Sequence, residues 1–114
     1  MALVKVVPAA AVPPGQTHFV EIGGVPVILA NYEGEIHALY GICPHQDNPL
    51  EGATLWGPLL DCPFHHFQFD VRSGENHFPK RVYPDDMPRL RSQVRPLPRY
   101  PVEVRDGDVW VDLG

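Results

Sequence analysis

The chain has 114 residues with 14 Pro, 10 Gly and 2 Cys, a length typical of one domain. Pro and Gly are too frequent for a bundle of long helices, and two Cys allow at most one disulfide bridge. The net charge of −5 disfavours nucleic acid as a partner, because a protein that neutralises phosphates needs the opposite sign. No apolar run approaches the roughly 20 residues that span a bilayer, so we expect no membrane segment.

The first 40 residues predict an antiparallel meander of short strands. The apolar run within residues 1–15 is interrupted by Pro8, Pro13 and Pro14, which indicates a strand and a turn rather than an export signal. Without such a signal, we expect a cytoplasmic protein, in which cysteines bind metal more often than they cross-link. Gly23-Gly24 and Glu33-Gly34 are hairpin signals. The expected strands are residues 3–7, 18–22, 25–31 and 35–40.

The end of the chain predicts one more hairpin. Residues 100–104 alternate in polarity, Asp106-Gly107 is a strong turn dipeptide, and residues 108–113 form the closing strand. We expect these terminal strands to pair with the first meander, so that both ends build one sheet system.

The region between, residues 41–98, holds 9 of the 14 Pro and has little periodicity. We expect short strands near residues 58–61 and 67–72. A stretch of this length needs an organising element other than a hydrophobic core. Its aromatic residues argue against disorder and are interpreted as packing around loops: Trp56, Phe64, Phe67 and Phe69.

Both cysteines lie in this region, and each has a histidine at ligand spacing. The strings are Cys43-Pro44-His45 and, sixteen residues later, Cys62-Pro63-Phe64-His65. Two such loops supply two thiolates and two imidazoles, which suit a tetrahedral Zn²⁺ or an iron–sulfur cluster. A zinc finger of this ligand set usually pairs Cys with Cys and His with His along the chain. Here each loop supplies one of each, an arrangement that a two-metal cluster accommodates.

Residues 41–75, GICPHQDNPLEGATLWGPLLDCPFHHFQFDVRSGE, resemble the cluster-binding region of Rieske proteins. Residues 100–113, YPVEVRDGDVWVDL, are similar to the closing hairpin of the small Rieske-type ferredoxins. The resemblance implies one 2Fe–2S cluster per chain, with Cys43 and Cys62 on the inner iron and His45 and His65 on the outer iron. It also implies a single all-β Rieske domain over residues 1–114. Its antiparallel sandwich or barrel base would be residues 1–40 and 99–114, with a two-loop cluster-binding subdomain inserted at about 41–98.

The departures from that family also carry information. Rieske subunits of respiratory complexes have an additional disulfide-forming Cys in each loop, but Asn48 and Phe64 stand there in this chain. Phe67 and Phe69 stand where those proteins place hydrogen-bond donors, so we expect a low potential, roughly −150 mV. His66 stands where the family commonly has Gly and is interpreted as a neighbour of the site rather than a ligand.

The resemblance implies a one-electron carrier and not an enzyme. Such a protein would take electrons from an NAD(P)H-dependent flavoprotein reductase and pass them to a terminal oxygenase for aromatic compounds, by weak, salt-sensitive docking of a monomer. The sequence has no two-His-one-carboxylate iron triad. Two alternatives remain open: the small Rieske subunit of an assimilatory nitrite reductase, and a Zn-binding structural or interaction module.

Charge is uneven along the chain. Residues 80–99 hold six basic and two acidic residues, a balance of +4 that leaves −9 for the remainder. This segment is interpreted as a solvated loop, with a docking patch for an acidic partner as the alternative. Asp47 and Glu51 flank the first loop as candidates for an acidic rim. Three histidines outside the motif, His18, His37 and His77, are expected to be ordinary strand or loop residues.

Overall fold

The structure is a computed structural model that describes residues 3–43, 48–63, 68–78 and 97–113. The described residues form antiparallel strands and one short 3₁₀ helix, η1 (Ala9–Ala11), which confirms the all-β class. Within these ranges, no helix has the length and apolar character needed to cross a membrane.

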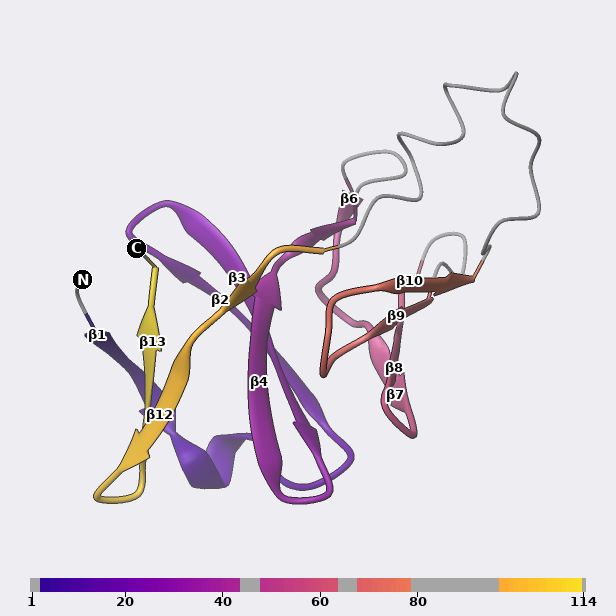
Figure 1. Ribbon diagram of the computed structural model, residues 1–114. Helices are drawn as coiled ribbons and strands as arrows, with labels where there is room; N and C mark the ends of the chain where they lie inside the picture. Colours follow the sequence, from indigo (N-terminus) through magenta and orange to yellow (C-terminus); the bar gives the residue numbers. More distant parts are fainter. Residues whose placement is uncertain (1–2, 44–47, 64–67, 79–96, 114) are drawn as a thin grey trace.

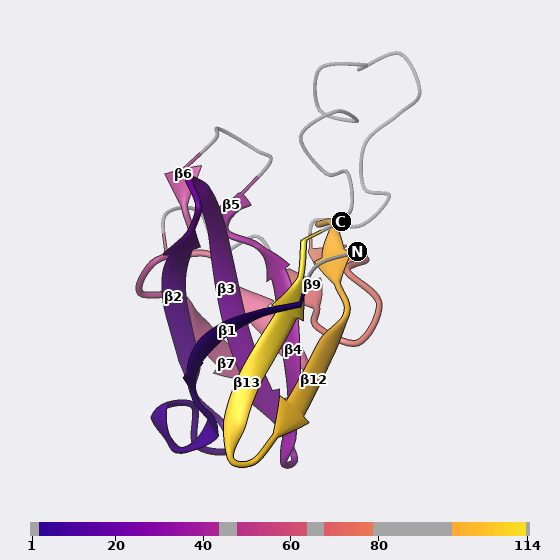
Figure 2. The same cartoon turned by 90° about the vertical axis from the view of Figure 1, so that its left-hand side faces the viewer.

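Two antiparallel sheets form the larger part of the described fold (Figures 1 and 2). They bury a shared apolar cluster that includes Val27 and Leu29 from one sheet and Val109 and Val111 from the other. The first sheet has the order β11 (Arg99–Tyr100), β4 (Glu35–Tyr40), β3 (Val25–Tyr32) and β2 (Thr17–Ile22). The second has the order β1 (Leu3–Pro8), β13 (Asp108–Asp112) and β12 (Val102–Arg105).

The predicted hairpin turns are confirmed by their backbone angles. In the β3–β4 turn, Glu33 and Gly34 have φ values of 54° and 89°. Asp106 and Gly107 in the β12–β13 turn have φ values of 50° and 80°. Positive φ at both central residues is the type I′ geometry, whose twist matches that of the flanking strands.

The pairing of the chain ends differs from the expectation in two ways. Strand β1 lies outside the meander and pairs with β13, with Leu3 opposite Asp112. The reason is that η1 and a turn at Pro13, closed by a 3.0 Å bond from Gln16 N to the Pro13 carbonyl, carry the chain to the other sheet. The expected strand 100–104 is divided at Pro101, which cannot donate to a ladder. Thus β11 joins β4 and β12 joins β13, and the ends build two sheets rather than one.

The middle of the chain forms short strands, including the two expected near residues 58–61 and 67–72. The order in a small four-stranded sheet is β10 (Asn76–Phe78), β9 (Gln68–Asp70), β8 (Leu59–Asp61) and β7 (Thr54–Trp56). A two-stranded sheet pairs β5 (Ile42–Cys43) with β6 (Asn48–Pro49).

A second buried cluster joins these short strands to the meander. Ile28, Ala30 and Leu39 from β3 and β4 belong to it. Its other members come from the middle and later parts of the chain: Leu50, Ala53, Leu60, Cys62, Phe69, Val71 and Leu97. The middle strands therefore share a hydrophobic core with the meander, rather than forming one of their own.

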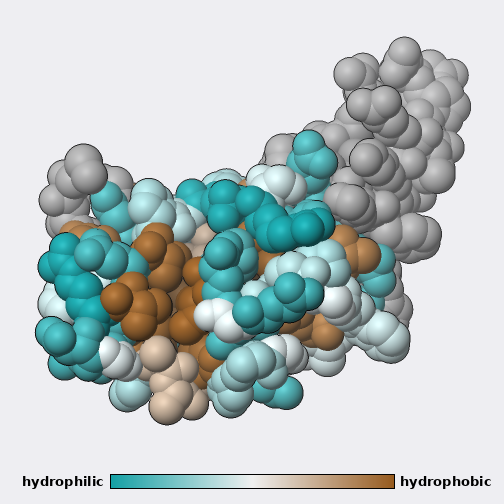
Figure 3. All heavy atoms as spheres, turned by 60° about the horizontal axis from the view of Figure 1, so that its bottom comes forward, coloured by the Kyte–Doolittle hydropathy of each residue, from teal (hydrophilic) through white to brown (hydrophobic). Residues whose placement is uncertain are grey.

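One aromatic residue is not where the sequence placed it. Phe69 is fully buried, which confirms its packing role, but Trp56 is 66% exposed at the β7–β8 turn. The interpretation of Trp56 as packing was therefore wrong. Its indole Nε1 donates to Thr54 Oγ1 over 3.0 Å, an exposed contact within the hairpin itself. Figure 3 shows one face of the molecule on which apolar residues gather. Besides Trp56, the large apolar residues that are exposed among the described ones are Val4 and Val104.

Candidate metal centre

Each predicted cysteine lies where a strand ends in a hairpin connection. Cys43 ends β5, opposite Asn48 at the start of β6. Cys62 directly follows β8, whose last residue Asp61 is opposite Gln68 at the start of β9. Each motif therefore occupies the connection of an antiparallel strand pair. His45 and His65 lie outside the described residues, as do His66, Phe64 and Phe67.

Cys62 is fully buried in the core shared by the meander and the short strands. Leu60, Phe69 and Leu39 belong to the same cluster. An apolar environment of this kind opposes an isolated thiolate, because burial penalises the charged form. Metal coordination removes that penalty and deprotonates a ligating thiol outright. The environment of Cys62 therefore fits a thiolate ligand of an iron–sulfur cluster.

The second loop is framed by a polar contact at its base. Gln68 Nε2 donates to Asp61 Oδ2 over 3.1 Å, between the residues that face each other across β8 and β9. Asp61 is buried with 7% exposure, so this bond forms in a largely dry environment. It holds together the two strand ends between which Cys62 and His65 lie in the sequence.

The first loop begins at a point of close backbone approach. Gly41 N donates to the Pro26 carbonyl over 2.9 Å, and the Gly41 carbonyl accepts from Leu50 N over 2.7 Å. A Cβ on Gly41 would lie 2.9 Å from the Phe19 ring and 3.0 Å from the Pro26 backbone. Glycine is therefore needed for β5 to leave the meander at this place, two residues before Cys43.

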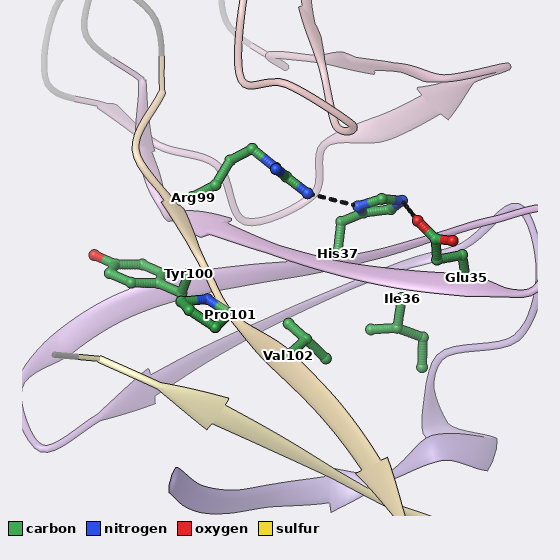
Figure 4. Close-up of a pocket in the computed structure, with 7 residues that line it drawn as sticks. All are labelled: Glu35, Ile36, His37, Arg99, Tyr100, Pro101 and Val102. Carbon is green, nitrogen blue, oxygen red and sulfur yellow. Dashed lines mark hydrogen bonds and ion pairs between the residues drawn. The ribbon is translucent and has the colours of Figure 1, made fainter. Parts of the chain in front are cut away.

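A pocket of about 520 Å³ lies beside the meander (Figure 4). The buried side chain of His37 connects two charged residues there. Nδ1 lies 3.1 Å from Arg99 Nη2, and Nε2 lies 3.0 Å from Glu35 Oε1, without the alignment of a hydrogen bond. Arg99 Nε also donates to the Val71 carbonyl over 3.1 Å. The residues that line the pocket are Glu35, Ile36, His37, Arg99, Tyr100, Pro101 and Val102.

Sequence reasoning missed this contact. His37 is a strand residue, as expected, but its partner lies 62 positions away, and no local spacing links them. Burial lowers the pKa of His37 below its ordinary value; Glu35 partly offsets this effect, and Arg99 reinforces it.

The structure describes only part of the expected acidic rim and of the basic segment 80–99. Glu51 is exposed, which a rim would require, whereas Asp47 lies outside the described residues. Residues 79–96, most of the basic segment, also lie outside them, and Arg99 is described. Of the described residues alone, no three His, Cys, Asp or Glu side chains gather into a metal-binding group.

Comparison with known proteins identifies relatives along almost the whole chain. The model of the Rieske [2Fe-2S] domain matches residues 2–100. The ferredoxin component of biphenyl 2,3-dioxygenase from Rhodococcus jostii (strain RHA1) is 31% identical over 113 residues, which cover 99% of this chain and 94% of that protein. The ferredoxin component of the alkene monooxygenase system from Xanthobacter autotrophicus is 34% identical over 92 residues, 75% of either chain.

Solved structures of related ferredoxins have the same fold. The ferredoxin of carbazole 1,9a-dioxygenase from Nocardioides aromaticivorans IC177 superposes with a TM-score of 0.79 over 97% of both chains, and at 22% identity this similarity shows the fold. A chain in a complex of reduced oxygenase and oxidized ferredoxin of carbazole 1,9a-dioxygenase is 27% identical, with a TM-score of 0.75, over 96% of this chain and 91% of that one.

Proposed function

Since this chain belongs to the Rieske [2Fe-2S] family, we propose that it is a ferredoxin that transfers single electrons from an NAD(P)H-dependent flavoprotein reductase to a terminal oxygenase. The 2Fe–2S cluster of a Rieske domain supplies one-electron chemistry. The observation that carries the proposal is the near full-length match to ferredoxin components of oxygenase systems. A related chain in a complex of oxygenase and ferredoxin supports the oxygenase as the acceptor.

The ligand set is proposed from the two motifs and the positions of their cysteines. Cys43 and Cys62 would hold the inner iron, and His45 and His65 the outer iron. The burial of Cys62 in the shared core supports its assignment to the inner position, because a dry environment keeps solvent from the thiolate. Asp61 and Gln68 would keep the second loop closed at its base.

The remaining parts of the proposal concern the state of the protein. We propose a carrier with no catalytic activity of its own, because an electron shuttle needs only a cluster near the surface and a docking face. We also propose a cytoplasmic monomer of one Rieske domain, with residues 41–98 as the cluster-binding part and both ends as the base. Docking would be weak and salt-sensitive, so that partners separate after each transfer.

The relatives bear on the two alternatives, a nitrite reductase subunit and a Zn-binding module. The two relatives described above are ferredoxin components of a dioxygenase and a monooxygenase system, so the nitrite reductase alternative receives no support. The family match to a [2Fe-2S] domain likewise favours a cluster over a single structural Zn²⁺. Aromatic compounds as the oxygenase substrates are proposed from the biphenyl and carbazole systems among the relatives.

The test combines composition, spectroscopy and transfer kinetics. Purified protein is expected to contain two irons and two acid-labile sulfides, and to show a Rieske EPR signal when reduced. Rapid mixing with an oxidised terminal oxygenase should then re-oxidise it, at a rate that falls with added salt. A colourless protein with one Zn²⁺ would contradict the cluster assignment. A reduced ferredoxin that no aromatic-ring oxygenase re-oxidises would contradict the proposed acceptor.

A further inference from the structure

Arg99 connects three parts of the fold through one guanidinium group. It belongs to β11, and its Nη2 lies 3.1 Å from Nδ1 of His37 on β4. Its Nε donates over 3.1 Å to the carbonyl of Val71, the residue that follows β9. Figure 4 shows the Arg99 side chain extended toward the His37 ring. The guanidinium therefore joins the meander to the end of the β8–β9 hairpin, which carries Cys62.

Backbone bonds place Arg99 at the same junction. The Pro98 carbonyl accepts from Tyr40 N over 2.9 Å, which attaches this segment to β4. Leu97 N donates to the Gly74 carbonyl over 2.8 Å, which attaches it to the turn after β9. Residues 97–99 thus lie between the meander and the hairpin, and the Arg99 side chain contacts both.

The His37 contact depends on the protonation state of the imidazole. A guanidinium group can only donate, so Nδ1 of His37 must be the nitrogen without a proton. The neutral ring then carries its proton on Nε2, which faces Glu35 Oε1 at 3.0 Å. A second proton would turn Nδ1 into a donor that faces another donor and bring two positive charges together. Protonation of His37 is therefore incompatible with the Arg99 contact.

Charged groups from all the neighbouring elements act on His37. Glu35 on the same strand and Asp70 on β9 favour the protonated ring. Arg99 on β11 and Arg72 after β9 oppose it. Since the side chain is only 4% exposed, burial also opposes the charge. The ring is therefore neutral near pH 7 and gains its proton in acid.

We propose that Arg99 is a positioning residue that holds the β8–β9 hairpin against the meander while His37 is neutral, and that protonation of His37 releases it. The hairpin carries the second ligand loop, so the consequence for the cluster rests on the proposed function. The release itself is a property of the fold and can be measured without electron transfer.

Amide hydrogen exchange of the cluster-loaded protein tests the release. We compare pH 7.5 with pH 5.0 and correct for the intrinsic exchange rate. Peptides over residues 68–76 should lose about tenfold in protection at pH 5.0, the effect of one buried hydrogen bond, while peptides over residues 17–32 should change less. Equal protection of residues 68–76 at both pH values would overturn the proposal.

Two variants separate the role of the contact from a general loss of structure. His37→Asn keeps an acceptor near the position of Nδ1 but does not titrate, so residues 68–76 should stay protected at both pH values. Arg99→Lys cannot make both contacts, so protection should be reduced at both. The exposed Arg105, which pairs with Glu103, provides the matched control Arg105→Lys, expected to behave as wild type. A His37→Asn protein that loosens in acid as wild type does would overturn the proposal, because its other histidines are unchanged.

A spectroscopic readout connects the hairpin to the cluster. The EPR signal of the reduced wild-type protein should shift or broaden between pH 7.5 and 5.0, and this additional change should be absent in His37→Asn. If the EPR signals of both proteins responded identically to pH, the Arg99 contact would have no influence on the cluster environment. Failure of the proposed function would show as absent iron and sulfide, and failure of this inference as an unchanged exchange profile, so the two outcomes are distinguishable.

Discussion

The side-chain amide of Asn31 binds the backbone of Val12, 19 positions earlier in the chain, through a 2.8 Å bond from Nδ2 to the Val12 carbonyl. Its Oδ1 accepts from Gly34 N, also over 2.8 Å. Asn31 is 6% exposed and Val12 is fully buried, so water has little access to replace either bond. One side chain thus attaches the crossing between the two sheets to the β3–β4 turn.

Asn31→Ala is therefore expected to lower the free energy of unfolding by about 1–3 kcal/mol, because it leaves a buried carbonyl without its donor. Urea unfolding followed by circular dichroism measures the change. The control is Arg105→Ala on the exposed face of β12, which should leave the urea midpoint nearly unchanged. Equal midpoints for Asn31→Ala and wild type would contradict this interpretation.

Two glycines have similar backbone angles, but we expect their replacement by alanine to lower the free energy of unfolding by different amounts. Gly74 and Gly52 have φ values of 82° and 87°, so alanine is strained at either position. A Cβ at Gly74 would also collide with the Leu97 carbonyl, whereas at Gly52 it would meet open space. We expect Gly52→Ala to cost about 1–2 kcal/mol and Gly74→Ala distinctly more. Thermal unfolding of both variants measures which one loses more stability. Similar losses would mean that the contact between Gly74 and Leu97 adjusts without cost.

His37 also gives the stability of the protein a dependence on pH. Its folded-state pKa is below the ordinary value of 6.5, because burial outweighs the pull of Glu35. Between that lowered pKa and about pH 6.5 the unfolded chain binds more protons, so stability rises with pH through this window and is lost in acid. Urea midpoints measured from pH 5 to 8 should rise less steeply in His37→Asn than in wild type. A parallel dependence in both proteins would remove His37 as its source.

The ligand assignment predicts a contrast between adjacent histidines. His65→Ala and Cys62→Ser are expected to abolish the Rieske EPR signal and reduce the bound iron, because each removes a proposed ligand. His66→Gly should keep both, and it serves as the matched variant in the same loop. Loss of the signal in His66→Gly alone would reassign the ligand to that residue.

The reduction potential is expected near the low end of the Rieske range, roughly −150 mV. Phe69 is fully buried in the cluster of apolar residues that contains Cys62, and its side chain has no hydrogen-bond donor for a sulfur. Asn48 and Phe64 stand where the resemblance to Rieske subunits of respiratory complexes would place disulfide-forming cysteines. Protein-film voltammetry measures the midpoint, and a value above about +100 mV would be incompatible with this reasoning.

The strands with strong local signals could be predicted from the sequence. The Gly23-Gly24, Glu33-Gly34 and Asp106-Gly107 turns fix hairpins because few other dipeptides accept two positive φ values. We expected the terminal strands to pair with the first strands, and β13 does pair with β1. The division into two sheets was missed, because pairing between distant strands has no such local signature. The spacing of Cys and His within each motif is local and predicts two ligand loops, whereas the contact between His37 and Arg99 joins distant positions and was not foreseeable.

Trp56 shows a further limit of sequence reasoning. An aromatic residue in a loop-rich region is buried more often than not, and Phe69 follows that rule. Burial of Trp56 depends on whether another element reaches the β7–β8 turn, and the sequence carries no information about that. The residue is instead 66% exposed.

The pairing of Leu3 with Asp112 has a consequence for the order of folding. While the chain is being synthesised, β1 has no partner until residues 108–112 have left the ribosome, whereas the β2–β3–β4 meander can form from neighbouring segments. The proposed ligand loops emerge in between, when only the meander is available to support them. Such long-range closure slows folding, so the newly made chain would present the proposed ligands before the second sheet exists.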